Sequence, residues 1–241
     1  MRLAIISDIH GNLEALRAVA RDIDSSDCDR IVCAGDIVGY GPEPEKCIEL
    51  IRERSSGTIG GNHDYALRGD FPIEKLNGMA RAAIIWSRER LSECSTAYLK
   101  TLCAAWHADG WMMAHGSPEN PEDFTYAHTP FEASRAFACF SEKVCFVGHT
   151  HIPLIFTFKR GRITKDHPGT KDLLDGERYL VNVGSVGQPR DLDNRACYCI
   201  FDEAKQRLEF KRVPYNIAKT MNDIRRNGLP SFLAERLLNG Q

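Results

Sequence analysis

Short apolar runs alternate with helical patterns through the first half of the chain. Residues 2–6 are apolar on both faces, which is typical of a buried strand. An amphipathic helical pattern follows, and Asn12 is placed to cap it. Its apolar face consists of Leu13, Leu16, Val19, Ala20 and Ile23. Further apolar strands are expected at residues 30–34, 58–59, 111–114 and 144–147. This alternation predicts an α/β fold with parallel strands.

The pattern changes after residue 150. Consecutive strands are expected at residues 154–158, 179–183, 196–201 and 207–213. The last of these alternates, with Leu208 and Phe210 on one side and charged residues on the other, which indicates a second and mostly antiparallel layer. Two short amphipathic helices complete the chain, and we expect them to pack on the body, with a partner surface as the alternative.

Composition excludes several classes of protein. The 241 residues are 43% hydrophobic and 27% charged, which is ordinary globular usage, and the formal net charge is -2. That balance argues against strong binding to nucleic acid or to an anionic membrane. No window has the continuous apolar length of a membrane span. The nine cysteines show no C-x-x-C spacing, so we expect free thiols and a cytoplasmic protein. The sequence leaves the possibility of a homo-oligomer open.

Histidines and carboxylates gather where the apolar runs stop. Five of the eight histidines follow such runs, and so do two aspartates and an asparagine. The set comprises Asp8, His10, Asp36, Asn62, His63, His115, His149 and His151. Because ligands bind at the carboxyl ends of strands in α/β sheets, we expect these side chains to converge at one edge.

Each motif alone also suits a turn or a helix cap, but all of them supply metal-type ligands at strand ends. Mixed Asp, Asn and His donors suit manganese, iron, cobalt, nickel or zinc. No cysteine lies within the clusters, which argues against a closed structural zinc site. The donors are too many for one tetrahedral ion, whereas two ions about 3.5–4 Å apart and bridged by a carboxylate would use them all.

Five motifs together resemble those of the calcineurin-like metallophosphoesterase superfamily. They are Asp8-Ile9-His10, Gly35-Asp36, Gly61-Asn62-His63-Asp64, His115, and Gly148-His149-Thr150-His151. All occur in order over residues 8–151, so the resemblance is specific. It implies a four-layer αββα sandwich of two mixed β-sheets flanked by helices, with residues 1–241 as one domain.

The resemblance implies a role for each candidate ligand. One divalent ion would be held by Asp8, His10 and His151. The second would be held by Asn62, His115 and His149. Asp36 would bridge both ions, for which manganese is the favoured metal among those named above. A hydroxide between the ions would attack phosphorus, which makes the chain a hydrolase of phosphoric ester bonds.

Two further residues complete the implied machinery. His63, which is not a ligand in the family, would act as general acid and protonate the leaving oxygen. Asp64 would orient His63, as a carboxylate behind an imidazole does.

Departures from the family's protein phosphatases narrow the substrate. Those enzymes carry a Gly-Asp-x-x-Asp-Arg-Gly run, whereas this chain has Gly35-Asp36-Ile37-Val38-Gly39-Tyr40-Gly41. They also place an arginine where this chain has Gly60. A phosphoprotein substrate is therefore disfavoured. The chain looks more like the small prokaryotic phosphodiesterases, some of whose relatives cleave dinucleoside polyphosphates.

Substrate contacts are less clearly marked. Tyr40 could stack on a base or simply pack in the core, and Arg190, after the glycine-rich residues 184–187, could bind a distal phosphate or lie in a surface turn.

We expect a small phosphate ester or nucleotide as substrate. A phosphodiesterase is the leading hypothesis, with a diadenosine tetraphosphate-type hydrolase as the alternative. A non-catalytic metal-binding scaffold is the alternative of another class, and no P-loop or dinucleotide-binding motif occurs.

Overall fold

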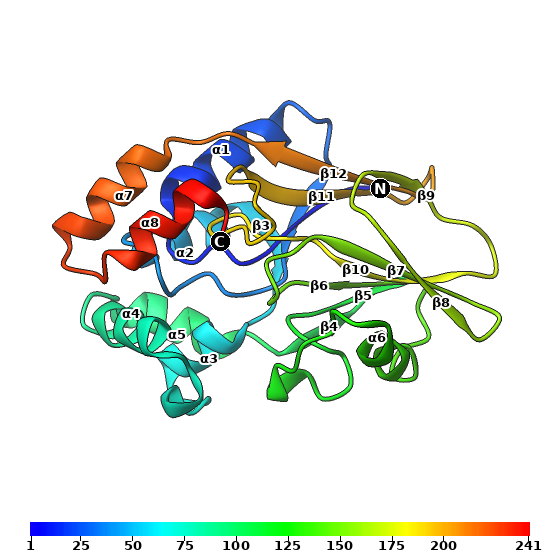
Figure 1. Cartoon of the computed structure of the whole chain (residues 1–241), viewed down its shortest axis with the longest axis horizontal. Helices are drawn as coiled ribbons and strands as arrows, with labels where there is room; N and C mark the ends of the chain where they lie inside the picture. Colours follow the sequence, from blue (N-terminus) through cyan, green and yellow to red (C-terminus); the bar gives the residue numbers. More distant parts are fainter.

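Buried apolar strands form the centre of two facing sheets, shown for residues 1–241 by the computed structural model (Figure 1). Each sheet has six strands. The first runs β3 (Ser55–Thr58), β2 (Arg30–Cys33), β1 (Arg2–Ile6), β11 (Ala196–Asp202), β12 (Arg207–Val213) and β9 (Thr170–Asp172). The second runs β4 (Ala105–His107), β5 (Trp111–Ala114), β6 (Val144–Val147), β10 (Arg178–Asn182), β7 (Leu154–Lys159) and β8 (Arg162–Asp166).

Parallel and antiparallel pairs occur in both sheets. In the first, β1 lies between a parallel neighbour, β2, and an antiparallel one, β11. In the second, β10 lies between parallel β6 and antiparallel β7. The expected separate antiparallel layer is therefore wrong: the late strands divide between the two sheets. The reason is that β11 and β10 pair with the edges that β1 and β6 leave open, and the remaining late strands add outside them.

Helices cover the outer faces of both sheets. On one side lie α1 (Leu13–Asp24), α2 (Pro44–Arg54), α7 (Ile217–Arg226) and α8 (Phe232–Asn239). On the other lies α6 (Pro130–Phe137), which begins at a capping box formed by Thr129 and Glu132. The expected αββα sandwich of two mixed sheets is confirmed, with one apolar cluster between the sheets and one beneath each helical layer.

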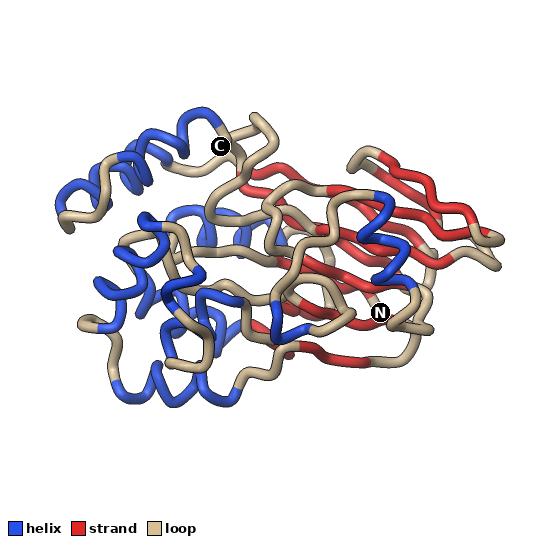
Figure 2. Tube along the Cα trace, turned by 60° about the horizontal axis from the view of Figure 1, so that its bottom comes forward, coloured by secondary structure: helices blue, strands red, loops and turns tan.

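A further group of helices lies at one end of the sheets (Figure 2). It comprises α3 (Asn62–Arg68), η1 (Ile73–Lys75), α4 (Gly78–Arg88) and α5 (Glu93–Thr101), while η2 (Pro121–Asp123) lies in the loop before α6. These elements make most of residues 73–101 helical.

The two C-terminal helices pack on the body, as expected. Met221, Ile224, Leu233 and Leu237 are buried in the same apolar cluster as α1. The Thr220 hydroxyl donates to Asn12 Oδ1 at 3.0 Å. No helix of the structure combines the length and the apolar character that a membrane crossing requires.

Candidate metal centre

The predicted ligands converge where strands of both sheets end. Asp8 and His10 follow β1, Asp36 follows β2, and His115 follows β5. His149 and His151 follow β6, and Asn62 is the first residue of α3. Three triads of potential ligand atoms result: Asp8, His10 and His151; Asp36, His115 and His149; and His10, Asp36 and His63. The first triad holds the three ligands implied for one ion, and the second holds His115 and His149, implied for the other ion, together with the implied bridge Asp36.

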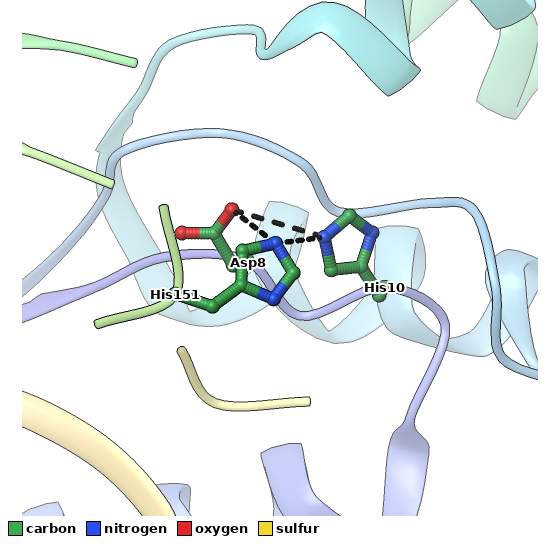
Figure 3. A group of neighbouring side chains, drawn as sticks. All are labelled: Asp8, His10 and His151. Carbon is green, nitrogen blue, oxygen red and sulfur yellow. Dashed lines mark hydrogen bonds and ion pairs between the residues drawn. The ribbon is translucent and has the colours of Figure 1, made fainter. Parts of the chain in front are cut away.

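Figure 3 shows the side chains of the first triad pointing at one another. The Nε2 atoms of His10 and His151 lie 3.0 Å apart, and Asp8 Oδ1 lies 3.3 Å from His151 Nε2. Asp36 Oδ2 lies 3.6 Å from His10 Nε2 and 3.2 Å from His115 Nε2, so this one carboxylate oxygen faces both triads. That is the position a bridging ligand needs.

Backbone carbonyls fix which ring nitrogen faces the cluster. His10 Nδ1 lies 3.0 Å from Val38 O, His115 Nδ1 lies 2.7 Å from Ala34 O, and His151 Nδ1 lies 2.6 Å from Gln188 O. A carbonyl only accepts, so each Nδ1 donates its proton. In its neutral form, each ring therefore presents the lone pair of Nε2 to the cluster, as metal-binding histidines do.

These donors fit divalent cations. Asn62 Oδ1 and His115 Nε2 are buried and accept or donate no hydrogen bond. Lone pairs on His10 and His151 also face each other at 3.0 Å. Buried polar atoms left without partners destabilise a fold by about 1–3 kcal/mol each. A cation among them would satisfy every one of these atoms, and the mixed oxygen and nitrogen set suits borderline divalent metals.

Burial shifts the pKa values of the candidate ligands. Burial raises the pKa of Asp8 to about 7 and lowers the pKa of His10 and of His151 well below the ordinary value. Burial also lowers the pKa of His115, but the Asp36 carboxylate outweighs it and raises that pKa to about 9. Without a cation, a proton on His115 thus neutralises Asp36. A bound dication would displace that proton.

The backbone at the ligands is held in an uncommon conformation. Five of the seven candidates have left-handed φ angles: Asp8 at 53°, His10 at 49°, Asp36 at 53°, His149 at 66° and His151 at 61°. Non-glycine residues in this region are strained, and such strain concentrates at functional sites. Fixed partners hold them there: Asp8 Oδ2 accepts the His149 N–H at 3.0 Å, and Asp36 Oδ1 accepts the His63 N–H at 2.9 Å.

His63 lies beside the cluster, and Asp64 does not touch its ring. His63 is 4% exposed, and its Nδ1 has no hydrogen-bond partner. The Asp64 carboxylate accepts from the backbone N–H groups of Ile37, Val38 and Gly61 at 3.0, 3.2 and 3.0 Å. The expected Asp64–His63 contact is therefore not formed, because those three backbone donors occupy the carboxylate instead.

A cavity of about 210 Å³ opens onto the ligands. Its lining includes residues that the sequence did not predict, among them Phe71, Lys75, Phe124 and Tyr126. The Tyr126 ring stacks on His149, with the centroids 4.4 Å apart. Phe124 and Tyr126 lie in the loop before α6, whose exposed His128 does not line the cavity.

Both expected substrate contacts line this cavity. Tyr40 is only 4% exposed, and its ring packs against His10 and His63, which favours the packed interpretation over stacking on a base. Arg190 is partly exposed and forms no ion pair; its Nη2 donates to Gln188 and its buried Nε has no partner. Arg190 is thus placed to meet an anion.

Known proteins resemble this chain over most or all of its length. Residues 1–206 match the family model described as the calcineurin-like phosphoesterase superfamily domain. The uncharacterised protein MJ0912 of Methanocaldococcus jannaschii is 39% identical over 99% of this chain and 98% of its own length.

Solved structures of other proteins share the fold of this chain. A metallophosphoesterase from Sphaerobacter thermophilus is 40% identical, covering 100% of this chain and 99% of its own, with a TM-score of 0.89. The protein PH1004 of Pyrococcus horikoshii OT3 shares the fold at 20% identity and a TM-score of 0.79, over 100% of this chain and 98% of its own.

Proposed function

Because this chain belongs to the calcineurin-like phosphoesterase superfamily, we propose that it is a phosphodiesterase that uses two divalent metal ions. The observation that carries the proposal is the convergence of six of the seven candidate ligands in neighbouring triads, beside a cavity that Asp36, Asn62, His149 and His151 line. A non-catalytic scaffold is disfavoured, because binding a partner protein requires neither the candidate proton donor His63 nor all seven candidate metal ligands.

The ligand sets follow the triads. Asp8, His10 and His151 would hold one ion, and His115, His149 and Asn62 the other, with Asp36 between them. When bound, the ions would supply a water nucleophile at neutral pH and neutralise the phosphoryl oxygens. We propose manganese as the native metal and the cytoplasm as the site of action.

The chain's own residues would handle the remaining charge and proton. His63 lines the cavity and would donate a proton to the leaving oxygen as general acid. Arg190, which has a free buried N–H and no carboxylate partner, would bind a phosphoryl oxygen. Asp64 would act at a distance, by holding the backbone of Ile37 and Val38 in place.

A diadenosine tetraphosphate-type substrate is the second candidate. Lys75 lines the same cavity as Arg190, and neither forms an ion pair with a carboxylate. Two unpaired cations beside the metal ligands would favour a substrate that carries further phosphates. Arg190 would bind one phosphoryl group by itself, so Lys75 would contact a phosphate only in a longer substrate.

A hydrolysis panel tests the proposal. Purified protein with added Mn²⁺ would be assayed on p-nitrophenyl phosphate, bis(p-nitrophenyl) phosphate and diadenosine tetraphosphate. We expect the diester to be cleaved with the highest kcat/KM. A preference for the dinucleotide would favour the second candidate, and an absence of turnover on all three after full metal loading would contradict an enzymatic function.

A further inference from the structure

We propose that Gly39 and Tyr40 form a cradle that sets the orientation of the His63 ring. Packing, and not a carboxylate partner, would then position the proton donor. The inference rests on the proposed role of His63 and adds two positioning residues to it. Gly39 and Tyr40 lie in the loop that follows the bridging Asp36, on a different segment from His63.

Gly39 leaves room that the His63 ring fills. A Cβ atom built on Gly39 would lie 2.2 Å from His63 Nδ1 and 3.0 Å from its Cγ. Atoms cannot approach so closely, so any side chain at this position would push the ring away. The φ angle of Gly39 is +93°, which glycine adopts without strain. The imidazole therefore rests directly on the backbone of the loop.

Tyr40 supports the ring from another side. Its centroid lies 4.6 Å from that of His63 and 4.7 Å from that of His10, and it is 4% exposed. Tyr40 has a φ of 56°, an uncommon value for a large side chain, which turns the ring inward beside the metal ligands. The contact is made by the ring, so the phenyl group should suffice.

No polar partner replaces this support. His63 Nδ1 is buried without a hydrogen bond, and the Asp64 carboxylate, the partner expected from the sequence, is occupied by three backbone donors. Two of those donors, Ile37 and Val38, belong to the same loop as Gly39. Val38 O also anchors His10 Nδ1 at 3.0 Å. The loop is therefore rigid enough to serve as a cradle.

The test compares Gly39→Ala with His63→Ala, using Gly161→Ala as a matched control. Gly161 has a φ of +80°, and a Cβ there meets nothing within 4 Å, so the control carries the backbone strain without a collision. Each Mn²⁺-loaded variant would be assayed on bis(p-nitrophenyl) phosphate, whose leaving group needs no proton, and on a dithymidine dinucleotide, whose alkoxide does. Metal content would be measured in parallel, and the His63 Cε1–H NMR resonance would be recorded on Zn²⁺-loaded protein, because paramagnetic Mn²⁺ would broaden a resonance so close to the site.

We expect Gly39→Ala to lower kcat on the dinucleotide about 10- to 100-fold, because small misplacements of catalytic groups have effects of this size. In Gly39→Ala, the rate on the aryl diester, the KM values and the metal content should change little. The control Gly161→Ala should behave like the wild-type protein. The His63 resonance, assigned by its loss in His63→Ala, should shift in Gly39→Ala. Tyr40→Ala should show the same selective loss of kcat on the dinucleotide as Gly39→Ala, and Tyr40→Phe should have wild-type rates.

The outcomes separate this inference from the proposed function. If His63→Ala slows both substrates equally, His63 is not the proton donor, and the proposed role is overturned together with the cradle. If His63→Ala is selective while Gly39→Ala and Tyr40→Ala leave the dinucleotide rate and the His63 resonance unchanged, the cradle alone is overturned. Equal loss on both substrates in Gly39→Ala, with metal released, would also overturn it.

Discussion

At the scale of single residues, the candidate ligands combine burial with strained backbone. Asp8 and Asp36 are almost inaccessible to water and also adopt left-handed φ angles. Each such residue costs about 1–3 kcal/mol, which the surrounding hydrogen bonds must offset. The residue types at these positions were predictable because metals need them. Their φ angles were not, because no local sequence signal marks a strained aspartate or histidine.

Asp36→Asn should weaken both metal sites at once. Asn can still accept the His63 N–H through its oxygen, but it removes the negative charge that faces His10 and His115. Loss of an outer-shell partner typically lowers metal affinity about 10–100-fold, and a bridging ligand should exceed this. Elemental analysis and turnover would both be measured. Near-normal metal content and activity would refute the bridging position.

Arg190→Ala should impair substrate binding more than metal binding. Arg190 contacts Gln188 and the Tyr40 face but no ligand side chain through a hydrogen bond. Charge-assisted hydrogen bonds contribute about 1.5–3 kcal/mol, which corresponds to roughly a 10- to 150-fold loss of kcat/KM. Metal content serves as the control, with Arg195→Ala as a matched exposed arginine that pairs with Asp193. An unchanged kcat/KM would contradict the phosphate contact.

At the scale of elements, the buried parallel strands and the residues after them were predictable. Apolar runs mark β1, β2, β5 and β6, and the ligands follow directly. The short edge strands β4, β8 and β9 were missed, because exposed edge strands are only partly buried and carry no continuous apolar run. Phe71, Lys75, Phe124 and Tyr126 were missed for another reason: loops brought together by tertiary packing show no periodicity.

Asp64→Ala should destabilise the junction between α3 and the loop after β2. Three backbone N–H groups, those of Ile37, Val38 and Gly61, would lose their buried acceptor. Unsatisfied buried donors cost about 1–3 kcal/mol each, so we expect a loss of about 3 kcal/mol or more in the free energy of unfolding. Urea unfolding would measure it. Asp64→Asn, which keeps one oxygen, should lose less, and equal losses would argue against the hydrogen-bond explanation.

At the scale of the whole molecule, the family resemblance gave the layered architecture correctly, whereas strand patterning alone did not. Alternation indicated an antiparallel layer but held no information on which sheet each strand would join. The choice depends on contacts between distant residues, such as Leu3 with Phe201. The single domain over residues 1–241 stays a prediction, and the packing of α7 against α1 supports it.

Metal binding should stabilise the whole fold. At about 100 times Kd, one bound ion contributes about 2.7 kcal/mol, which corresponds to roughly 5–10 °C in Tm for a chain of this size. Thermal unfolding of chelated and Mn²⁺-loaded protein would measure the shift.

The Mn²⁺-dependent shift should be larger at pH 8 than at pH 6. Burial raises the pKa of Asp8 to about 7, so below that pH protons compete with the ion for its carboxylate, and above it they do not. Asp36→Asn should abolish most of the shift at both pH values. A chelated protein that unfolds at the same temperature as the loaded one would contradict metal binding at this site.

The position of β1 between β2 and β11 has a consequence for synthesis on the ribosome. Residues 2–6 need a partner that is translated almost two hundred residues later, at Ala196–Asp202. Until that segment emerges, one side of the central strand has no hydrogen-bonded neighbour, so Asp8 and His10 cannot be fixed opposite His151. The nascent chain must therefore carry Asp8 and His10 unassembled through most of translation, and the candidate metal centre is complete only near the end of elongation.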